Sequence, residues 1–338
     1  MKTIGVLTSG GDSQGMNAAI RAIVRTGLDE GFRIMGIYGG YKGLIDGNIK
    51  ELFATDVSDR ISRGGTFLKS ARCLEFKEEA GILKAVETCK KFGIDGIVVI
   101  GGDGSFRGAR DLTLHGIPCV AMPGTIDNDI VCSEYTIGFD TAVNIVVDLV
   151  DRLRDTSSSH NRCSVVQIMG KNAGWVTLEG GIATGATCIL VPEVEFDFQR
   201  DIVDRIEAGK KLGKDSFIVM VSEGVFFNVK TNKNYQYIVD NDLDNPTKIA
   251  KAIEKATGVE SRETILGQVQ RGGSPTARDR IVATEMGNYC VNLLKKGISN
   301  RVVVMKDEKV VDYDIVEGLN MEKPFNIERL RMANSINI

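Results

Sequence analysis

The stretch Gly96-Ile97-Val98-Val99-Ile100-Gly101-Gly102-Asp103-Gly104-Ser105 joins a short apolar run to an abrupt glycine turn. A run of this length, rich in β-branched residues, is typical of a strand buried in a parallel sheet. Glycines directly after such a strand let the backbone turn into a helix and approach a ligand closely. Because the first turn of a helix presents free N–H groups, the stretch predicts a binding site for an anion such as a phosphate.

Two other strand ends carry similar signals. Ile4-Gly5-Val6-Leu7 precedes the turn Ser9-Gly10-Gly11-Asp12-Ser13, and helical spacing of apolar residues resumes from Asn17 to Arg25. The run Pro118–Met122 precedes Pro123-Gly124-Thr125-Ile126-Asp127-Asn128-Asp129. Open α/β proteins bind ligands at the sheet edge where the carboxyl ends of parallel strands meet. We therefore expect the three strand ends to converge if their strands belong to one sheet.

Carboxylates at these strand ends indicate metal binding and proton transfer. Asp127 and Asp129 are two residues apart, so in an extended segment their side chains point the same way. Like charges held together are costly unless a cation or a transferable proton lies between them. Asp103 would repel a phosphate unless Mg²⁺ bridged the two. We therefore predict Asp103 and Asp129 as magnesium ligands and Asp127 as the acceptor of a proton from an attacking hydroxyl. The alternative for the stretch around Asp127 is a turn satisfied by local hydrogen bonds.

The rest of the chain alternates between strand-like and helical runs. This pattern predicts an α/β fold with two Rossmann-like parallel-sheet domains flanked by helices, and 338 residues fit two domains. Residues 42–78 and 225–245 show no periodicity and are expected to be irregular. We expect strands at 164–169, 187–191 and 217–221 and two around Asp307-Glu308, and helices at 82–92, 140–154, 201–212, 246–256 and 277–295.

The composition argues against several classes of protein. The formal net charge is −3 without a long basic run, so neither nucleic acid nor a membrane is an expected partner. No apolar run reaches the length of a membrane span, and the seven cysteines form no Cys-x-x-Cys pair, so we expect a cytoplasmic protein. No Gly-x-x-x-x-Gly-Lys-Ser/Thr sequence of a P-loop enzyme occurs, and Gly108 falls one residue late for the dinucleotide fingerprint. Phosphoryl transfer also needs positive charge, for which the candidates are Arg72, Arg162, Arg262 and Arg271.

Taken in order, the motifs resemble those of the bacterial ATP-dependent 6-phosphofructokinase family. The resemblance implies transfer of the ATP γ-phosphoryl group to the 1-hydroxyl of fructose 6-phosphate, with Mg²⁺, in a homotetramer with active sites at subunit interfaces. It also implies a large ATP-binding domain of residues 1–138 plus about 270–320, and a smaller sugar-phosphate domain of about 139–269 plus 321–338. The segments that carry it are Thr8–Asp12, Arg63–Thr66, Gly101–Ser105, Pro123–Asp129, Asp151–Thr156 and Gln270–Pro275.

The resemblance also implies roles for single positions. Asp127 corresponds to the catalytic base, with Arg72, Lys171 and Thr125 as further catalytic positions, and Asp103 to the magnesium ligand with Asp129 close by. The implied ATP site is formed by Gly11, Tyr41, Arg72, Cys73, Gly102, Asp103, Gly104, Ser105 and Gly108. The implied sugar-phosphate site is formed by Thr125, Ile126, Asp127, Met169, Gly170, Lys171, Glu223, Gln268 and Arg271, with Arg162 and Arg262 from a neighbouring subunit.

The chain departs from the family pattern at some of these positions. Lys171 replaces an arginine that would hold phosphoryl oxygens in a bidentate way, and Gln268 replaces a histidine and cannot add charge. The family resemblance also implies an effector site for ADP and phosphoenolpyruvate, and this chain retains four of its cationic residues. Thr187, however, replaces a metal-binding glutamate of that site, so we expect regulation by these two effectors to be weak. Those retained cations are Arg21, Arg25, Arg154 and Lys214.

The choice of phosphoryl donor is indicated by two glycines. Pyrophosphate-using relatives tend to carry a bulkier residue in place of Gly104 and a lysine in place of Gly124, so the glycines here favour ATP. The alternatives are a related kinase for pyrophosphate or another sugar phosphate, and a catalytically reduced ATP-binding subunit with a regulatory role. Lipid and NAD kinases share the Gly-Gly-Asp-Gly element without the full loop from Pro123 to Asp129.

Overall fold

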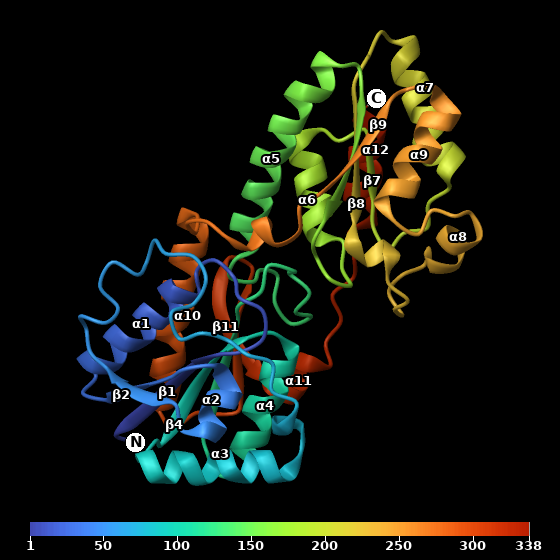
Figure 1. Cartoon of the computed structure of the whole chain (residues 1–338). Helices are drawn as coiled ribbons and strands as arrows, with labels where there is room; N and C mark the ends of the chain where they lie inside the picture. The colour runs from blue at the N-terminus through green and yellow to red at the C-terminus, as the bar shows by residue number, and fades with distance from the viewer. Residues whose placement is uncertain (338) are drawn as a thin grey trace. The chain divides into compact units, whose positions relative to one another are not determined.

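The computed structural model describes residues 1–337, which form two compact units (Figure 1). The first unit comprises Met1–Ile126, Ile130–Thr141 and Arg271–Lys323. The second unit comprises Asp127–Asp129, Ala142–Gln270 and the chain from Pro324 onward. The segment Asp127–Asp129 therefore packs with the second unit, although the chain on either side of it belongs to the first.

The first unit is built on a seven-stranded sheet with the strand order β11-β10-β5-β4-β1-β2-β3. The central strands pair in parallel, whereas β3 and β11 run antiparallel to their neighbours at the two edges. The strand-helix alternation predicted the parallel centre and missed the antiparallel edges. The strands are β1 (Thr3–Thr8), β2 (Arg33–Ile37), β3 (Ile49–Leu52), β4 (Gly96–Gly101), β5 (Cys119–Pro123), β10 (Arg301–Lys306) and β11 (Lys309–Asp314).

Hydrophobic cores lie on both faces of this sheet because successive residues of a buried strand point to opposite sides. Val98 and Ile100 of β4 pack in the core with α1 and α10, which lie side by side, whereas Ile97 and Val99 pack in the core with α3 and α4 (Figure 1). The helices of this unit are α1 (Met16–Asp29), α2 (Gly40–Asp46), η1 (Glu75–Lys77), α3 (Glu79–Phe92), α4 (Asp103–Leu114), α10 (Ala277–Lys295) and α11 (Ile315–Leu319).

The second unit contains a four-stranded, fully parallel sheet with the order β7-β8-β6-β9. Its strands are β6 (Cys163–Ile168), β7 (Cys188–Leu190), β8 (Phe217–Ser222) and β9 (Ser261–Ile265). Most residues of α5 (Phe139–Ser159) also belong to it, and its other helices are α6 (Trp175–Thr184), η2 (Gln199–Val203), α7 (Asp204–Lys211), η3 (Glu223–Phe226), α8 (Tyr235–Asp240), α9 (Pro246–Thr257), η4 (Gly267–Arg271) and α12 (Ile327–Ile336).

Two regions expected to be irregular are in fact partly ordered. Residues 42–78 contain most of α2 as well as β3 and η1, and residues 225–245 contain part of η3 and all of α8. The predictions were wrong for these elements, which are short, from three to seven residues, and too brief to show a periodic pattern. The stretches 53–74 and 227–234 contain no helix or strand, as expected. The helix expected from residue 140 begins one residue earlier, at Phe139.

A buried aspartate joins three segments of the first unit. Asp279, in the first turn of α10, is fully buried and accepts hydrogen bonds from the Tyr135 hydroxyl at 2.5 Å and the Gly138 N–H at 2.6 Å. The backbone N–H and hydroxyl of Thr141 donate to its other oxygen. Burial raises the pKa of Asp279, while these hydrogen bonds act in the opposite direction. The carboxylate thus fixes the path of the chain from β5 to α5.

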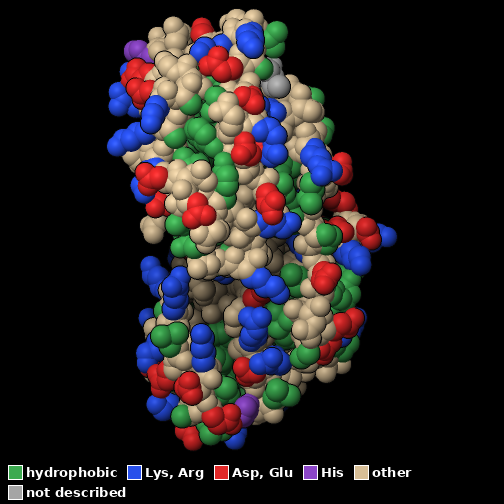
Figure 2. Space-filling view, turned by 90° about the vertical axis from the view of Figure 1, so that its right-hand side faces the viewer, with side chains coloured by type: hydrophobic (Ala, Val, Ile, Leu, Met, Phe, Trp, Pro, Cys, Tyr) green, Lys and Arg blue, Asp and Glu red, His purple; other side chains and the backbone are tan. Residues whose placement is uncertain are grey.

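Lysines and arginines are interspersed with aspartates and glutamates over the face shown in Figure 2. No helix within residues 1–337 is both long and apolar enough to span a membrane.

Candidate functional site

The two glycine turns of the first unit are in direct contact. Strands β5, β4 and β1 are neighbours in the sheet, so their carboxyl ends lie together as the sequence predicts. The Ser9 N–H donates to the Ile100 carbonyl at 2.9 Å, and the Ser105 hydroxyl donates to the Ser9 carbonyl at 3.2 Å. A side chain on Gly101 would collide with Ser9 and Ser105, so close packing of the two turns requires glycine there.

A carboxylate lies at the start of the helix that follows the second turn. Helix α4 begins at Asp103, with Gly102 as its N-cap. A negative charge in this position interacts favourably with the helix dipole. A Cβ atom on Gly104 would meet no atom within 4 Å, so the backbone beside the carboxylate is open to a ligand. This half of the site therefore combines exposed backbone with one acidic group.

Two predicted ATP-site residues have a packing role. The Tyr41 side chain is buried, its hydroxyl donates to the Ser105 carbonyl at 2.6 Å, and its ring stacks on Phe76 with centroids 4.1 Å apart. A Cβ atom on Gly108 would lie 2.6 Å from the Tyr41 ring, so this glycine makes room for it. Tyr41 therefore stabilises the glycine turn from the interior of the first unit, through its hydrogen bond to Ser105. Of the other predicted residues, Arg72 is exposed and Cys73 half-buried.

Arg271 contacts the first glycine turn. Its guanidinium donates to the Asp12 carbonyl at 2.9 Å, and a Cβ atom on Gly11 would lie 3.1 Å from the guanidinium. The adjacent Gly272 carbonyl accepts a hydrogen bond from the Gln14 amide at 2.7 Å. Sequence reasoning assigned Arg271 to the sugar phosphate and did not single out Gln14. The structure gives both residues a place at the turn between β1 and α1.

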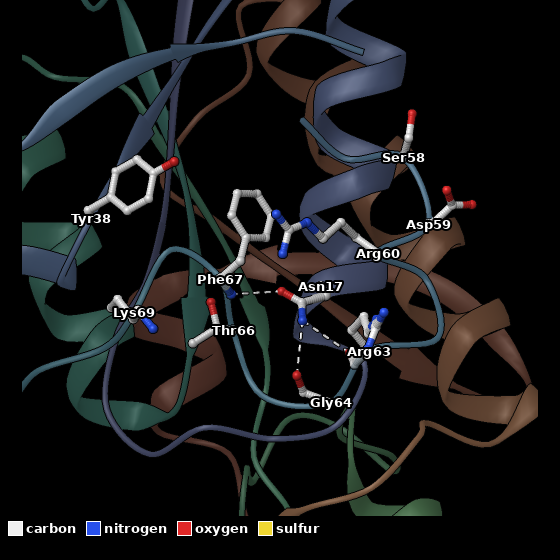
Figure 3. A pocket seen from close by; sticks show the side chains of 10 residues that line it. All are labelled: Asn17, Tyr38, Ser58, Asp59, Arg60, Arg63, Gly64, Thr66, Phe67 and Lys69. Atoms are coloured by element: carbon white, nitrogen blue, oxygen red, sulfur yellow. Dashed lines mark hydrogen bonds between the residues drawn. The ribbon is translucent and has the colours of Figure 1, made fainter. Parts of the chain in front are cut away.

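A cavity of about 670 Å³ lies next to this region in the first unit (Figure 3). Asn17 of α1 is buried at one side of it, where its amide donates to the Arg63 and Gly64 carbonyls and its oxygen accepts from the Phe67 N–H. The residues that line the cavity include none of the predicted ATP-binding positions. They are Asn17, Tyr38, Ser58, Asp59, Arg60, Arg63, Gly64, Thr66, Phe67 and Lys69.

The carboxylates of the loop after β5 lie in a bent segment. Asp127 is 6% exposed, and the Asp129 carboxylate lies 3.9 Å from the Lys171 ammonium group. Asn128 between them has a φ of 50°, so the segment is not extended and the argument that both side chains point the same way fails. Thr125 and Ile126 belong to the first unit, and the Ile126 side chain is fully buried, which leaves only its backbone for a ligand.

The loop after β6 carries three predicted sugar-site residues and is held tightly. The N–H groups of Gly170 and Lys171 donate to one oxygen of Glu223 at 3.2 and 2.7 Å. The Met169 N–H donates to the Gln270 side chain at 2.9 Å, and Lys171 has a left-handed φ of 56°. Glu223 thus fixes the loop that the sequence places around the sugar. Sequence reasoning quoted Gln270 within a motif without giving it a role.

The same loop ends at a second carboxylate, which sequence reasoning missed. The Gly174 N–H donates to Glu193 at 2.8 Å. Burial of this side chain raises the pKa of Glu193 from its ordinary value of 4.5 to about 7, against a lowering by the Gly174 N–H and by Lys233. Glu193 lies shortly after β7, behind Val191 and Pro192, where no charge pattern in the sequence marks it.

We expect the stability of the protein to depend on Glu193 between about pH 4.5 and 7. In this range the unfolded state releases the proton and the folded state keeps it, so stability falls as pH rises and is lowest above pH 7. Glu193→Gln should remove this component, so the variant gains melting temperature relative to the wild type at pH 8 and not at pH 4.5. Glu195→Gln, at an exposed neighbour, is the matched control. Equal differences at both pH values would contradict the prediction.

The two arginines predicted to reach a sugar phosphate lie next to each other. Ser164 of β6 pairs with Arg262 of β9, and both Arg162 and Arg262 form ion pairs with Glu260, at 3.0 and 2.7 Å. Hydrogen bonds from Arg162, and next from Arg262, lower the pKa of Glu260. One carboxylate thus holds both guanidinium groups. Gln268 lies exposed on η4 in the same unit.

The predicted effector cations fall on different units. Arg21 and Arg25 lie on α1, whereas Arg154 and Lys214 lie in the second unit. The Lys214 ammonium group donates to the Thr187 hydroxyl at 3.3 Å, and burial followed by the charge of Arg154 lowers the pKa of Lys214. Thr187 thus brings a hydroxyl, and no carboxylate, to this cationic group.

Comparison with known proteins identifies the family. The family profile described as "Phosphofructokinase" matches residues 3–294. A protein of Clostridium botulinum strain Hall, named ATP-dependent 6-phosphofructokinase, is 50% identical over 333 residues, which cover 98% of each chain. A protein of the same name from Clostridium tetani is 49% identical over 336 residues, with 99% of each chain covered. The chain belongs to the phosphofructokinase family.

Solved phosphofructokinase structures share the fold. Phosphofructokinase from Saccharomyces cerevisiae matches with a TM-score of 0.84 and 32% identity, and the match covers 94% of this chain and 45% of the yeast chain. The chain therefore spans less than half the length of that relative. A pyrophosphate-dependent phosphofructokinase from Marinobacter aquaeolei matches with a TM-score of 0.82 over 98% of this chain and 91% of its own. Its identity is only 18%, so this likeness shows the α/β fold and says nothing about the donor.

Proposed function

We propose that the chain is an ATP-dependent 6-phosphofructokinase, which transfers the γ-phosphoryl group of ATP to the 1-hydroxyl of fructose 6-phosphate. The observation that carries the proposal is the contact between the Ser9–Asp12 and Gly101–Ser105 turns at the carboxyl ends of β1 and β4. Two relatives at about half identity over nearly the whole chain carry the name of this activity. We also propose a cytoplasmic location and a homotetramer in which Arg162 and Arg262 serve a neighbouring subunit.

The first unit supplies the groups proposed to bind ATP. The N–H groups at the start of α4 and the exposed backbone at Gly104 suit phosphoryl oxygens, which prefer helix N-termini. Arg271, which already donates to the turn at Asp12, keeps a guanidinium beside Gly11. Arg72 is exposed, whereas Tyr41 and Gly108 pack against each other inside the protein. We assign Gly11, Gly102, Gly104 and Arg72 to the triphosphate.

Mg²⁺ fits the acidic group of this half. Magnesium in kinases is typically held by one or two carboxylates together with phosphoryl oxygens, and Asp103 offers a carboxylate beside open backbone. We assign Asp103 as its ligand, with Asp129 as the second. When bound, the ion would neutralise negative charge on the transferred phosphoryl group.

The second unit supplies the groups proposed to bind the acceptor and to take its proton. The loop Met169–Lys171, fixed by Glu223 and Gln270, presents backbone groups for the sugar. Asp127 would accept the proton of the 1-hydroxyl as that oxygen attacks phosphorus. Lys171, which lies near Asp129, would balance negative charge on the phosphoryl group. Arg162, Arg262 and Gln268 would bind the 6-phosphate.

Gly104→Asp is expected to raise the KM for ATP by at least about tenfold, because a carboxylate would repel a neighbouring phosphoryl group. The melting temperature should stay unchanged, since a side chain at this position meets no protein atom. Gly104→Ala is the control for size without charge and should have a smaller effect. An unchanged KM for ATP in Gly104→Asp would place the nucleotide elsewhere.

The function itself is tested by a donor panel with purified protein. Production of fructose 1,6-bisphosphate from fructose 6-phosphate is followed by a coupled assay with ATP or with pyrophosphate, each with and without Mg²⁺. We expect turnover with ATP and Mg²⁺ only. Turnover with pyrophosphate alone would refute ATP as the donor, and no turnover with either would refute the enzyme assignment.

A further inference from the structure

The segment Phe227–Asn234, here called the strap, is anchored by two buried asparagines. The Asn234 amide donates to the Val191 and Val194 carbonyls at 3.2 and 3.0 Å, and its oxygen accepts from the Phe196 N–H at 3.0 Å. The Asn234 side chain is 1% exposed. The strap therefore has a fixed path, although it belongs to the 225–245 region that shows no periodicity.

The second asparagine closes the strap on itself. The Asn232 amide donates to the Val225 and Phe227 carbonyls at 2.6 and 2.9 Å, and its oxygen accepts from the Asn234 N–H at 2.9 Å. These bonds fix both ends of the turn in which Thr231 lies. The position of the Thr231 hydroxyl is thereby set by buried groups on its C-terminal side.

The strap contacts the loop proposed to bind the sugar. The Thr231 hydroxyl donates to the Asn172 carbonyl at 2.9 Å, and the Lys233 N–H donates to the Pro192 carbonyl at 2.9 Å. In η3, just before the strap, Gly224 lies so close to the loop that a Cβ atom would approach the Lys171 carbonyl to 2.7 Å. The strap therefore lies along the outside of the loop between Gly170 and Gly174.

Every residue of the loop from Met169 to Gly174 has a backbone group bound by a side chain. Gln270 and Glu223 hold the first three N–H groups, Ser222 donates to the Ala173 carbonyl at 3.2 Å, and Glu193 accepts from the Gly174 N–H. The Asn172 carbonyl in the middle is held by Thr231 alone among these side chains. The strap thus completes the support of a loop that contains the strained residue Lys171.

We propose that Thr231 is a positioning residue that sets the affinity for the phosphoryl acceptor by holding the Gly170–Gly174 loop. The inference rests on the proposed function, because it takes this loop to bind the sugar phosphate. Without the hydroxyl, the Asn172 carbonyl loses its hydrogen bond from the strap, and the segment that contains the left-handed Lys171 is held less firmly. Part of the acceptor's binding free energy is then used to restore the loop, which appears as a higher KM for the acceptor.

The test compares Thr231→Val, which keeps the shape of the side chain, with Thr231→Ser, which keeps the hydroxyl. Thr231→Val should raise the KM for fructose 6-phosphate about three- to tenfold, the range that loss of one hydrogen bond explains, with the KM for ATP unchanged. Thr231→Ser should restore the wild-type KM. Thr55→Val, at an exposed threonine of the first unit, is the matched control.

Amide hydrogen exchange supplies a readout that does not depend on turnover. Exchange in a peptide covering residues 169–175 should be faster in Thr231→Val than in the wild type and Thr231→Ser. An unchanged KM for fructose 6-phosphate, or equal changes for both substrates, would overturn the proposal, as would unchanged exchange. If the wild type does not phosphorylate fructose 6-phosphate, the proposed function and the acceptor role of Thr231 both fail. Faster exchange would then support only its hold on the loop.

Discussion

Asp127→Asn is expected to lower kcat with ATP and fructose 6-phosphate by about 10²- to 10⁴-fold, the contribution typical of a general base. The amide keeps the size of the carboxylate, which suits a side chain that is 6% exposed, and it cannot accept a proton at neutral pH. The affinity for ATP should not change, because Asp127 is proposed to act on the acceptor hydroxyl and no contact with ATP is assigned to it. Steady-state kinetics and calorimetric titration with an ATP analogue measure the two quantities.

The control for Asp127→Asn is Asp148→Asn, at an exposed carboxylate of α5 outside the family motifs, which should retain full activity. Asp127→Ser should lower kcat at least as far as Asp127→Asn, because serine supplies no base either. A kcat within about threefold of the wild type in both Asp127 variants would refute the role of this residue as the base and would weaken the proposed function.

Asp279→Ala is expected to lower the free energy of unfolding by about 3–5 kcal/mol, the cost of breaking a buried, hydrogen-bonded charge site. The N–H groups of Gly138 and Thr141 and the Tyr135 hydroxyl all donate to this fully buried carboxylate. Removing it leaves buried donors without an acceptor and adds a cavity. Urea denaturation of the wild type and the variant, followed by near-ultraviolet circular dichroism, measures the loss.

Asp279→Asn separates hydrogen bonding from cavity formation. Each carboxylate oxygen accepts from a backbone N–H group, so either orientation of the amide places an NH₂ group against a donor. We expect this variant to lose stability as well, although it creates no cavity. A loss below about 1 kcal/mol in both variants would mean that the carboxylate does not hold these segments together in solution.

Local patterns were enough to predict the framework of the site. The apolar run before Gly101 predicted strand β4, and the glycines after it predicted the start of α4, because both depend on neighbours in sequence. The ends of β1, β4 and β5 were expected to meet if these strands share one sheet, and the structure places the three strands side by side. These features are local or follow from the way parallel sheets are connected.

Contacts between segments that are far apart in the sequence could not be predicted from local patterns. Arg271 and Asp12 are separated by 259 positions, and nothing near either residue in the sequence marks their hydrogen bond. From the spacing alone, the segment from Asp127 to Asp129 was expected to be extended. The left-handed conformation of Asn128 bends it instead. The conformation of the strap could not be predicted from the sequence either. It is fixed by hydrogen bonds from two asparagine side chains to the backbone, and such bonds leave no periodic pattern of apolar residues.

The open backbone at Gly104 also bears on how such a protein changes over evolutionary time. Gly101 is constrained by Ser9 and Ser105, so we expect a mutation there to impair folding. A mutation at Gly104 meets no such barrier, and only its effect on the ligand is exposed to selection. If Gly104 favours ATP as proposed, this part of the donor preference can change by mutation while the fold is kept.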